Sequence, residues 1–108
     1  MDNNSVFIGT ELKLNLHIEP INNITMDDFD FEVEVFTSTK KVATITKAEC
    51  KREDESNYIM FIDTDELGVG EIKCKVTAHI PDADFVDDGF RDEVLGINTG
   101  IFVTKDYE

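Results

Sequence analysis

A strict alternation of apolar and polar residues is the feature that most limits what this chain can fold into. Its clearest stretch is residues 11–18, where Leu12, Leu14, Leu16 and Ile18 occupy every second position. In a β-strand, side chains two residues apart lie on the same face, whereas a helix would spread these four residues around its circumference. The segment is therefore predicted to be a strand with one buried face and one solvated face.

The rest of the chain repeats this pattern in short segments separated by polar turns. Further strands are expected at residues 29–36, 42–47, 58–63, 71–80 and 93–103, and residues 48–52 either continue extended or kink into a short edge strand. Residues 58–63 are apolar on both faces, which predicts a central strand or one covered on both sides. No segment has helical periodicity. About seven short strands in 108 residues predict an all-β fold, an immunoglobulin-like β-sandwich, with a small closed barrel as the alternative.

The length suits a single domain, residues 1–108, in which residues 1–10 form an amino-terminal arm or a short strand. Residues at the centres of the inward faces should share one core. They are Leu14, Leu16, Val33, Ile62, Cys74 and Val76. Leu67 is expected to plug one end of this core, beside Gly68 and Gly70, which supply backbone angles that other residues avoid.

The two cysteines, Cys50 and Cys74, are predicted to remain free thiols. The chain has no Trp to pack on an antibody-type bridge, and a small cytosolic domain rarely keeps a disulfide. A zinc site would need more soft ligands than two cysteines and two distant histidines supply. No metal or cofactor is expected to be needed for folding.

The charge balance narrows the range of partners. Ten basic residues stand against 24 acidic ones, a net charge of −14. Nucleic acids and anionic membranes are not expected as partners, because both attract basic surfaces. The start is acidic and polar, and no run approaches the roughly 20 apolar residues of a membrane helix. We expect a soluble protein that stays in the cytoplasm of the cell that makes it.

Basic residues gather in the middle of the chain. They are Lys40, Lys41, Lys47, Lys51 and Arg52. If they share a surface, that surface could bind the acidic side of a neighbouring protein. The alternative is that they are solvated turn and edge residues, whose charges protect strand edges from aggregation.

The residues do not predict an enzyme. The three serines lie in expected loops or in the amino-terminal tail, His17 and His79 lie on polar strand faces, and no phosphate-binding glycine motif occurs. The best cluster of hard ligands, a weak calcium candidate, is Asp82, Asp84, Asp87 and Asp88. It departs from a calcium loop, since Val86 and Asp87 stand where an oxygen ligand and a glycine are required. The alternative is an exposed acidic loop between strands.

Two apolar groups are candidates for partner contact. Phe85 and Phe90 flank the acidic loop, and they either anchor a partner or cap the open end of the core. The segment Val6, Phe7 and Ile8 is more apolar than a solvated tail requires. It is either a partner anchor or a short strand that completes a sheet.

Five stretches together resemble a known family. They are GTELKLNLHIEP at 9–20, MDDFDFEVEV at 26–35, DTDELGVGEI at 63–72, AHIPD at 78–82 and INTG at 97–100. The chain resembles small immunoglobulin-like virion proteins of tailed phages that infect gut bacteria, the crAss-like phages and their relatives. The resemblance has no catalytic motif to carry over.

The resemblance implies a structural role. The expected protein is a capsid auxiliary or decoration protein that binds the major capsid protein or other virion subunits in many copies, and it resides in the virion after assembly in the host cytoplasm. The alternative role is a receptor- or glycan-binding module of a head fibre, tail or baseplate. Sugar-binding sites generally use exposed aromatic side chains as platforms, and this chain has few candidates, since it has no Trp and only two tyrosines.

Overall fold

The computed structural model describes residues 4–39 and 42–105. The strands are β1 (Ser5–Phe7), β2 (Glu11–His17), β3 (Asp30–Phe36), β4 (Val42–Thr46), β5 (Lys51–Asp54), β6 (Asn57–Asp63), β7 (Gly70–Pro81) and β8 (Phe90–Thr104). Two 3-10 turns, η1 (Lys47–Glu49) and η2 (Thr64–Glu66), interrupt them. Within the described ranges, no helix has the length and apolar character needed to cross a membrane. The prediction of an all-β fold is confirmed.

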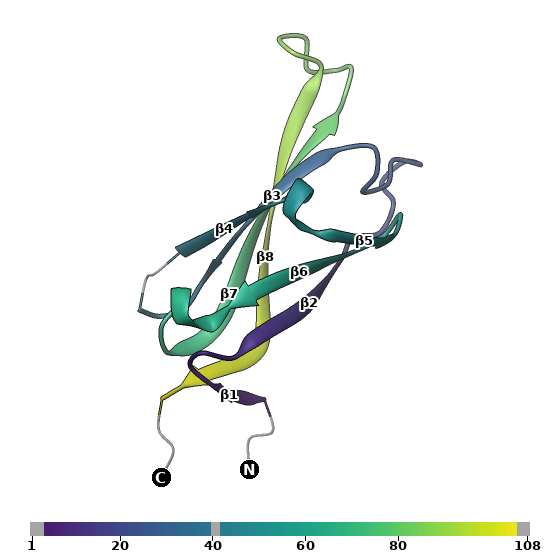
Figure 1. The fold of residues 1–108 in the computed structure, drawn as a ribbon. Coiled ribbons are helices and arrows are strands. Elements are labelled where there is room, and N and C mark those ends of the chain that lie inside the picture. Colours follow the sequence, from purple (N-terminus) through teal and green to yellow (C-terminus); the bar gives the residue numbers. More distant parts are fainter. Residues whose placement is uncertain (1–3, 40–41, 106–108) are drawn as a thin grey trace.

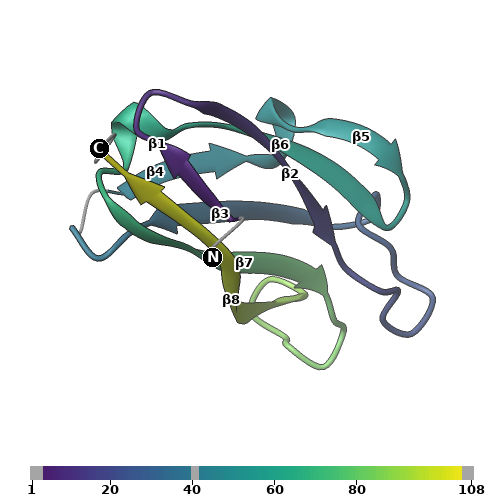
Figure 2. The ribbon, with the colours of Figure 1, turned by 90° about the horizontal axis from the view of Figure 1, so that it is seen from below.

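The strands form two sheets (Figures 1 and 2). The larger has the order β1-β8-β7-β3-β4, and the smaller has the order β2-β6-β5. Among the described strands, β1 and β8 alone pair in parallel, and the other pairs are antiparallel. Two sheets that contribute to one core are compatible with a β-sandwich.

The molecule is elongated, with extents of 56 × 26 × 23 Å. Its length comes from β7 and β8, whose far ends project beyond the smaller sheet as a hairpin at the top of Figure 1. The register joins Pro81 to Phe90 at the end of this ladder. The projecting hairpin therefore has no second sheet packed over its tip.

The core lies between the two sheets and follows the alternation in the sequence. Leu16, Val33, Ile62, Cys74 and Val76 are all buried, as predicted. Leu14 is the exception. It packs against the rim of the core and stays partly exposed, because β2 is an edge strand of its sheet.

Leu67 closes one end of the core, as predicted, and is fully buried. Its carbonyl accepts hydrogen bonds from the hydroxyls of Thr37 and Thr39, both at 2.7 Å. Gly68 and Gly70 next to it have φ angles of +83° and +122°. Glycine is needed at both positions, because L side chains rarely adopt such angles.

Of the two alternatives for residues 48–52, the structure has the kink into a short edge strand: η1 comes first, held by the Glu49 carboxylate, which accepts the backbone N–H of Thr46 at 2.9 Å, and β5 then forms an edge of the smaller sheet. β6 is central in its sheet, as one of the two interpretations had it. It is not covered on both sides, since Phe61 is 49% exposed on the outer face.

Candidate interaction surface

The predicted basic surface is not formed as expected. Lys40 and Lys41 lie outside the described residues. Lys47 turns inward, and its ammonium donates to the carbonyls of Met26 and Phe29, both at 2.8 Å. It stabilises the loop before β3 and is not free to bind a partner.

Arg52 and Lys51 also have separate environments. The Arg52 guanidinium donates two hydrogen bonds of 2.8 Å to the Asp27 carboxylate. Lys51, one residue earlier, lies on the outer face of the smaller sheet and pairs with Glu53 at 3.7 Å. Adjacent residues of a strand point to opposite faces, so Lys51 lies apart from Lys47 and Arg52, which both contact the loop around Asp27.

Asp27 is the centre of a polar cluster that sequence reasoning missed. Besides Arg52, it accepts a hydrogen bond of 2.6 Å from the Tyr58 hydroxyl. The Arg52 and Tyr58 hydrogen bonds lower the pKa of the Asp27 carboxyl to about 2. Burial and the same hydrogen bond raise the pKa of Tyr58 to about 12. The cluster fixes the loop before β3 on the smaller sheet.

The amino-terminal segment is a strand. Ser5, Val6 and Phe7 pair in parallel with Phe102, Val103 and Thr104 of β8. Val6 and Ile8 pack against the core, while Phe7 is 46% exposed. Of the two interpretations, the structure has the short strand that completes a sheet, and contact of this segment with a partner stays a prediction.

The tip of the β7–β8 hairpin carries exposed apolar side chains. Phe85 is 50% exposed and Val86 is 89% exposed. The loop is built by backbone hydrogen bonds, from Asp82 N–H to the Gly89 carbonyl and from Gly89 N–H to the Phe85 carbonyl, both at 2.8 Å. One interpretation placed Phe85 as a cap over the open end of the core, and its exposure shows that it is not one. It is half exposed on a hydrogen-bonded turn.

Phe90 belongs to a small cluster at the base of this turn. Its ring stacks on the imidazole of His79, with centroids 4.4 Å apart and planes 8° from parallel. The Nδ1 atom of His79 lies 2.7 Å from Asp92. The hydrogen bond to Asp92, and the nearby charges of Asp92, Asp88 and Asp30, raise the pKa of His79. This histidine faces solvent, as its predicted place on a polar strand face requires.

The four carboxylates of the calcium candidate are not gathered into a ligand set. Asp82 pairs with Arg91 at 3.0 Å, and its other oxygen accepts the Asp84 N–H. Asp88 accepts the N–H of Phe90. Within residues 4–39 and 42–105, no three His, Cys, Asp or Glu side chains are placed to hold a metal ion together. The loop has the exposed acidic character of the alternative interpretation.

An apolar groove runs between β2 and β8, where the two sheets do not close on each other. Its volume is about 300 Å³, and its apolar lining includes Leu14, Leu16, Met60, Ile97 and Ile101. β1 covers β8 only from Phe102 to Thr104. Sequence alternation placed these leucines and isoleucines on inward faces, but it carried no signal that the space between the two strands stays open.

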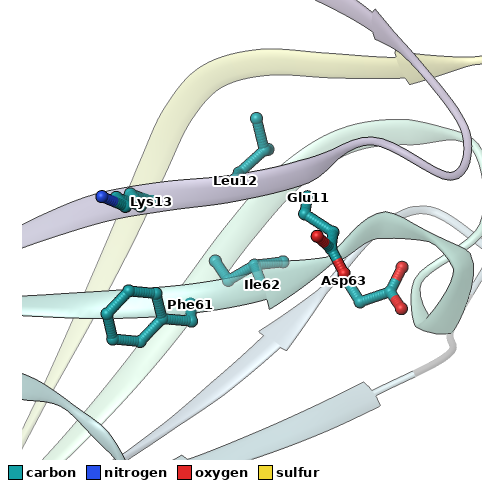
Figure 3. A pocket seen from close by; sticks show the side chains of 6 residues that line it. All are labelled: Glu11, Leu12, Lys13, Phe61, Ile62 and Asp63. Carbon is teal, nitrogen blue, oxygen red and sulfur yellow. The ribbon is translucent and has the colours of Figure 1, made fainter.

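A second concavity, of about 420 Å³, lies along β2 and β6 (Figure 3). Glu11, Lys13 and Asp63 surround it, and Leu12, Phe61 and Ile62 supply the apolar surface. This lining contains no Ser, Cys or His, the side chains that most often serve as nucleophile or base.

The cysteines are free, as predicted. Cys74 is buried, and burial raises the pKa of its thiol to about 11. Cys50 is partly buried, and burial raises its pKa too. Thiols of high pKa are poor nucleophiles at neutral pH.

No family model, curated protein or solved structure matches the chain.

Proposed function

We propose that this chain is a non-enzymatic structural module of a tailed-phage virion, a capsid auxiliary protein that binds a protein lattice through its β7–β8 hairpin. The observation that carries the proposal is the exposure of Phe85 and Val86 on a projecting turn that backbone hydrogen bonds hold together. Exposed aromatic side chains dominate the energetics of protein interfaces. A turn that is already held by backbone hydrogen bonds loses less conformational entropy on binding than a loop without such bonds.

We further propose that the fold is immunoglobulin-like. The order β8-β7-β3-β4 facing β2-β6-β5 corresponds to strands G-F-C-C′ facing B-E-D of a variable-type immunoglobulin sandwich. Cys74 lies on the strand that corresponds to F, but β2, which corresponds to B, holds leucines on its inner face. The core would then be closed by aliphatic packing in place of a disulfide on a Trp.

The expected partner presents basic groups around an apolar pocket. The hairpin from residue 82 to residue 93 holds six acids and one arginine. Opposite charge favours encounter and fixes orientation, while the net charge of −14 opposes association between identical copies. Attachment should therefore weaken between about 50 mM and 500 mM salt, over which the screening length falls by about threefold.

Two measurements test the proposal. Quantitative mass spectrometry of purified particles should find the chain in many copies per particle, and absence from particles would overturn the proposal. Co-sedimentation with particles that lack the chain should weaken at least tenfold on Phe85→Ser. Phe61→Ser is the matched control, because Phe61 is equally exposed but lies on the outer face of the smaller sheet. Equal attachment of the two variants would exclude the hairpin, and specific glycan binding by the free protein would favour the receptor-binding alternative.

A further inference from the structure

One edge of β8 lacks a neighbouring strand over most of its length. From Phe90 to Asn98, β8 pairs with β7 alone, and β1 joins its other edge only from Phe102 to Thr104. This holds within the described residues, 4–39 and 42–105. An uncovered edge presents a row of unpaired backbone N–H and C=O groups, which is a template for another strand.

The backbone groups that face outward follow from the register. Asp82 donates its N–H to the Gly89 carbonyl, and the same register continues along the hairpin. Hydrogen-bonded pairs recur at every second residue of an antiparallel ladder. Arg91, Glu93, Leu95 and Ile97 therefore bond to β7. The residues between them, Asp92, Val94, Gly96 and Asn98, direct their backbone groups to the open edge.

Apolar side chains flank this edge on both faces. Leu95, opposite Val76 on the inner face, is 38% exposed, and Val94 on the outer face is 55% exposed. The inner face continues into the groove between β2 and β8, where Leu14 and Ile97 remain partly exposed. A strand added beside β8 would bury apolar surface on both sides of the sheet.

The charges select the occupant. Asp92 and Glu93 lie on the upper half of β8, and four more acids lie in the hairpin turn; Arg91, the single cation between residues 82 and 93, pairs with Asp82 and Glu93, so the segment keeps a net negative charge. A second copy of this chain would bring the same negative charge against it. A segment that alternates apolar and basic residues would satisfy both the groove and the acids.

We propose that the open edge of β8 accepts an extended segment of the partner protein, with alternating apolar and basic side chains. The segment adds a strand to the larger sheet and places its apolar side chains over the groove between β2 and β8. β1 already occupies the same edge further along, so the added strand continues an arrangement that the chain uses internally. This proposal rests on the proposed function, since it names the chemistry of the partner that the module binds.

The test is an NMR titration of the full chain at low salt with a nine-residue peptide that alternates Lys and Val. Such a peptide spans roughly 30 Å, the length of the Phe90–Asn98 edge. Binding below about 1 mM should shift the amide signals of Asp92, Val94, Gly96 and Asn98 and slow their hydrogen exchange. A peptide of the same sequence with methylated backbone nitrogens, and one with Glu in place of Lys, should each bind at least tenfold more weakly, a difference of about 1.4 kcal/mol.

A substitution in β8 provides the second arm. Val94→Pro removes only an outward N–H, because the Val94 backbone does not bond to β7, and it should weaken peptide binding at least tenfold. Val94→Thr keeps the N–H and is the matched control. If the Pro variant does not fold, the methylated peptide alone decides the question.

Each outcome has one meaning. Equal binding of the methylated peptide, or shifts confined to residues 82–89, would overturn strand addition. Failure of the Lys-Val peptide to bind at 1 mM would overturn it too. If the wild-type chain still attaches to particles in either case, the proposed function stands. If the peptide binds the edge but the chain is absent from particles, the proposed function fails and strand addition stands.

Discussion

The two leucines of β2 provide a quantitative test of how the core is closed. Leu14 and Leu16 have the same chemistry, lie two residues apart and face the same way. Both border the groove, but Leu16 is 2% exposed, whereas the side chain of Leu14 is partly exposed. Leu16→Ala should cost about 3 kcal/mol, since it removes buried methyl and methylene groups worth about 0.8 kcal/mol each and leaves a cavity. Leu14→Ala should cost about 1 kcal/mol, because part of its surface is already hydrated and no closed cavity forms.

Urea unfolding followed by circular dichroism measures both losses. A difference of about 2 kcal/mol corresponds to roughly 8–16 °C in Tm for a domain of this size. If Leu14→Ala costs as much as Leu16→Ala, the groove is closed in solution and the reasoning about the β8 edge is refuted. A loss below about 0.5 kcal/mol for Leu16→Ala would mean that the inward face of β2 is misassigned.

Three further predictions concern the loops that frame the sheets. Lys47→Met should lower the free energy of unfolding, measured by chemical denaturation, by about 1–3 kcal/mol, because two loop carbonyls lose their donor. The control Lys51→Met should change it by less than about 0.5 kcal/mol. Equal effects of the two substitutions would contradict the structural role of Lys47. Gly70→Ala should lower the free energy of unfolding by about 1–3 kcal/mol, because φ is +122° and the new methyl group would meet the hydroxyl of Ser38. The control Gly96→Ala places its methyl group in open space and should be nearly neutral in the same assay. The pKa of Asp27 is lowered from 3.8 to about 2 in the folded chain. Its contribution to stability is therefore present above about pH 4 and is lost as the pH falls toward 2. Between pH 5 and pH 2, the free energy of unfolding of Asp27→Asn should decline less steeply than that of the wild type.

The strands with a strict alternation could be predicted from the sequence almost to the residue. Residues 11–18 and 71–80 correspond to Glu11–His17 and Gly70–Pro81. Their period of two leaves one consistent way to bury an apolar face. The segment at 48–52 has no such pattern, and there a local hydrogen bond from Thr46 to Glu49 sets the turn instead.

The candidate surfaces were harder to predict, because their properties depend on partners distant in the sequence. The sequence predicts that Lys47 and Arg52 are exposed cations. Each instead donates a hydrogen bond to Asp27, which precedes Lys47 by 20 residues and Arg52 by 25. A count of charges along the chain cannot separate a cation fixed in a loop from one available to a partner. The surface of the β7–β8 hairpin could be predicted more easily, because its acids and Phe85 lie close together in the sequence and therefore also at the tip of the hairpin.

The groove between β2 and β8 shows the limit of alternation most clearly. The pattern assigns Leu14 and Ile97 to inward faces, and both side chains do point between the sheets. Whether an inward face is covered depends on where the opposite sheet ends, which the period of a strand does not encode. Here the smaller sheet has three strands and the larger has five, so the apolar face of β8 extends past its cover. That excess of apolar surface beside an unpaired edge is the physical basis for expecting a strand from another protein.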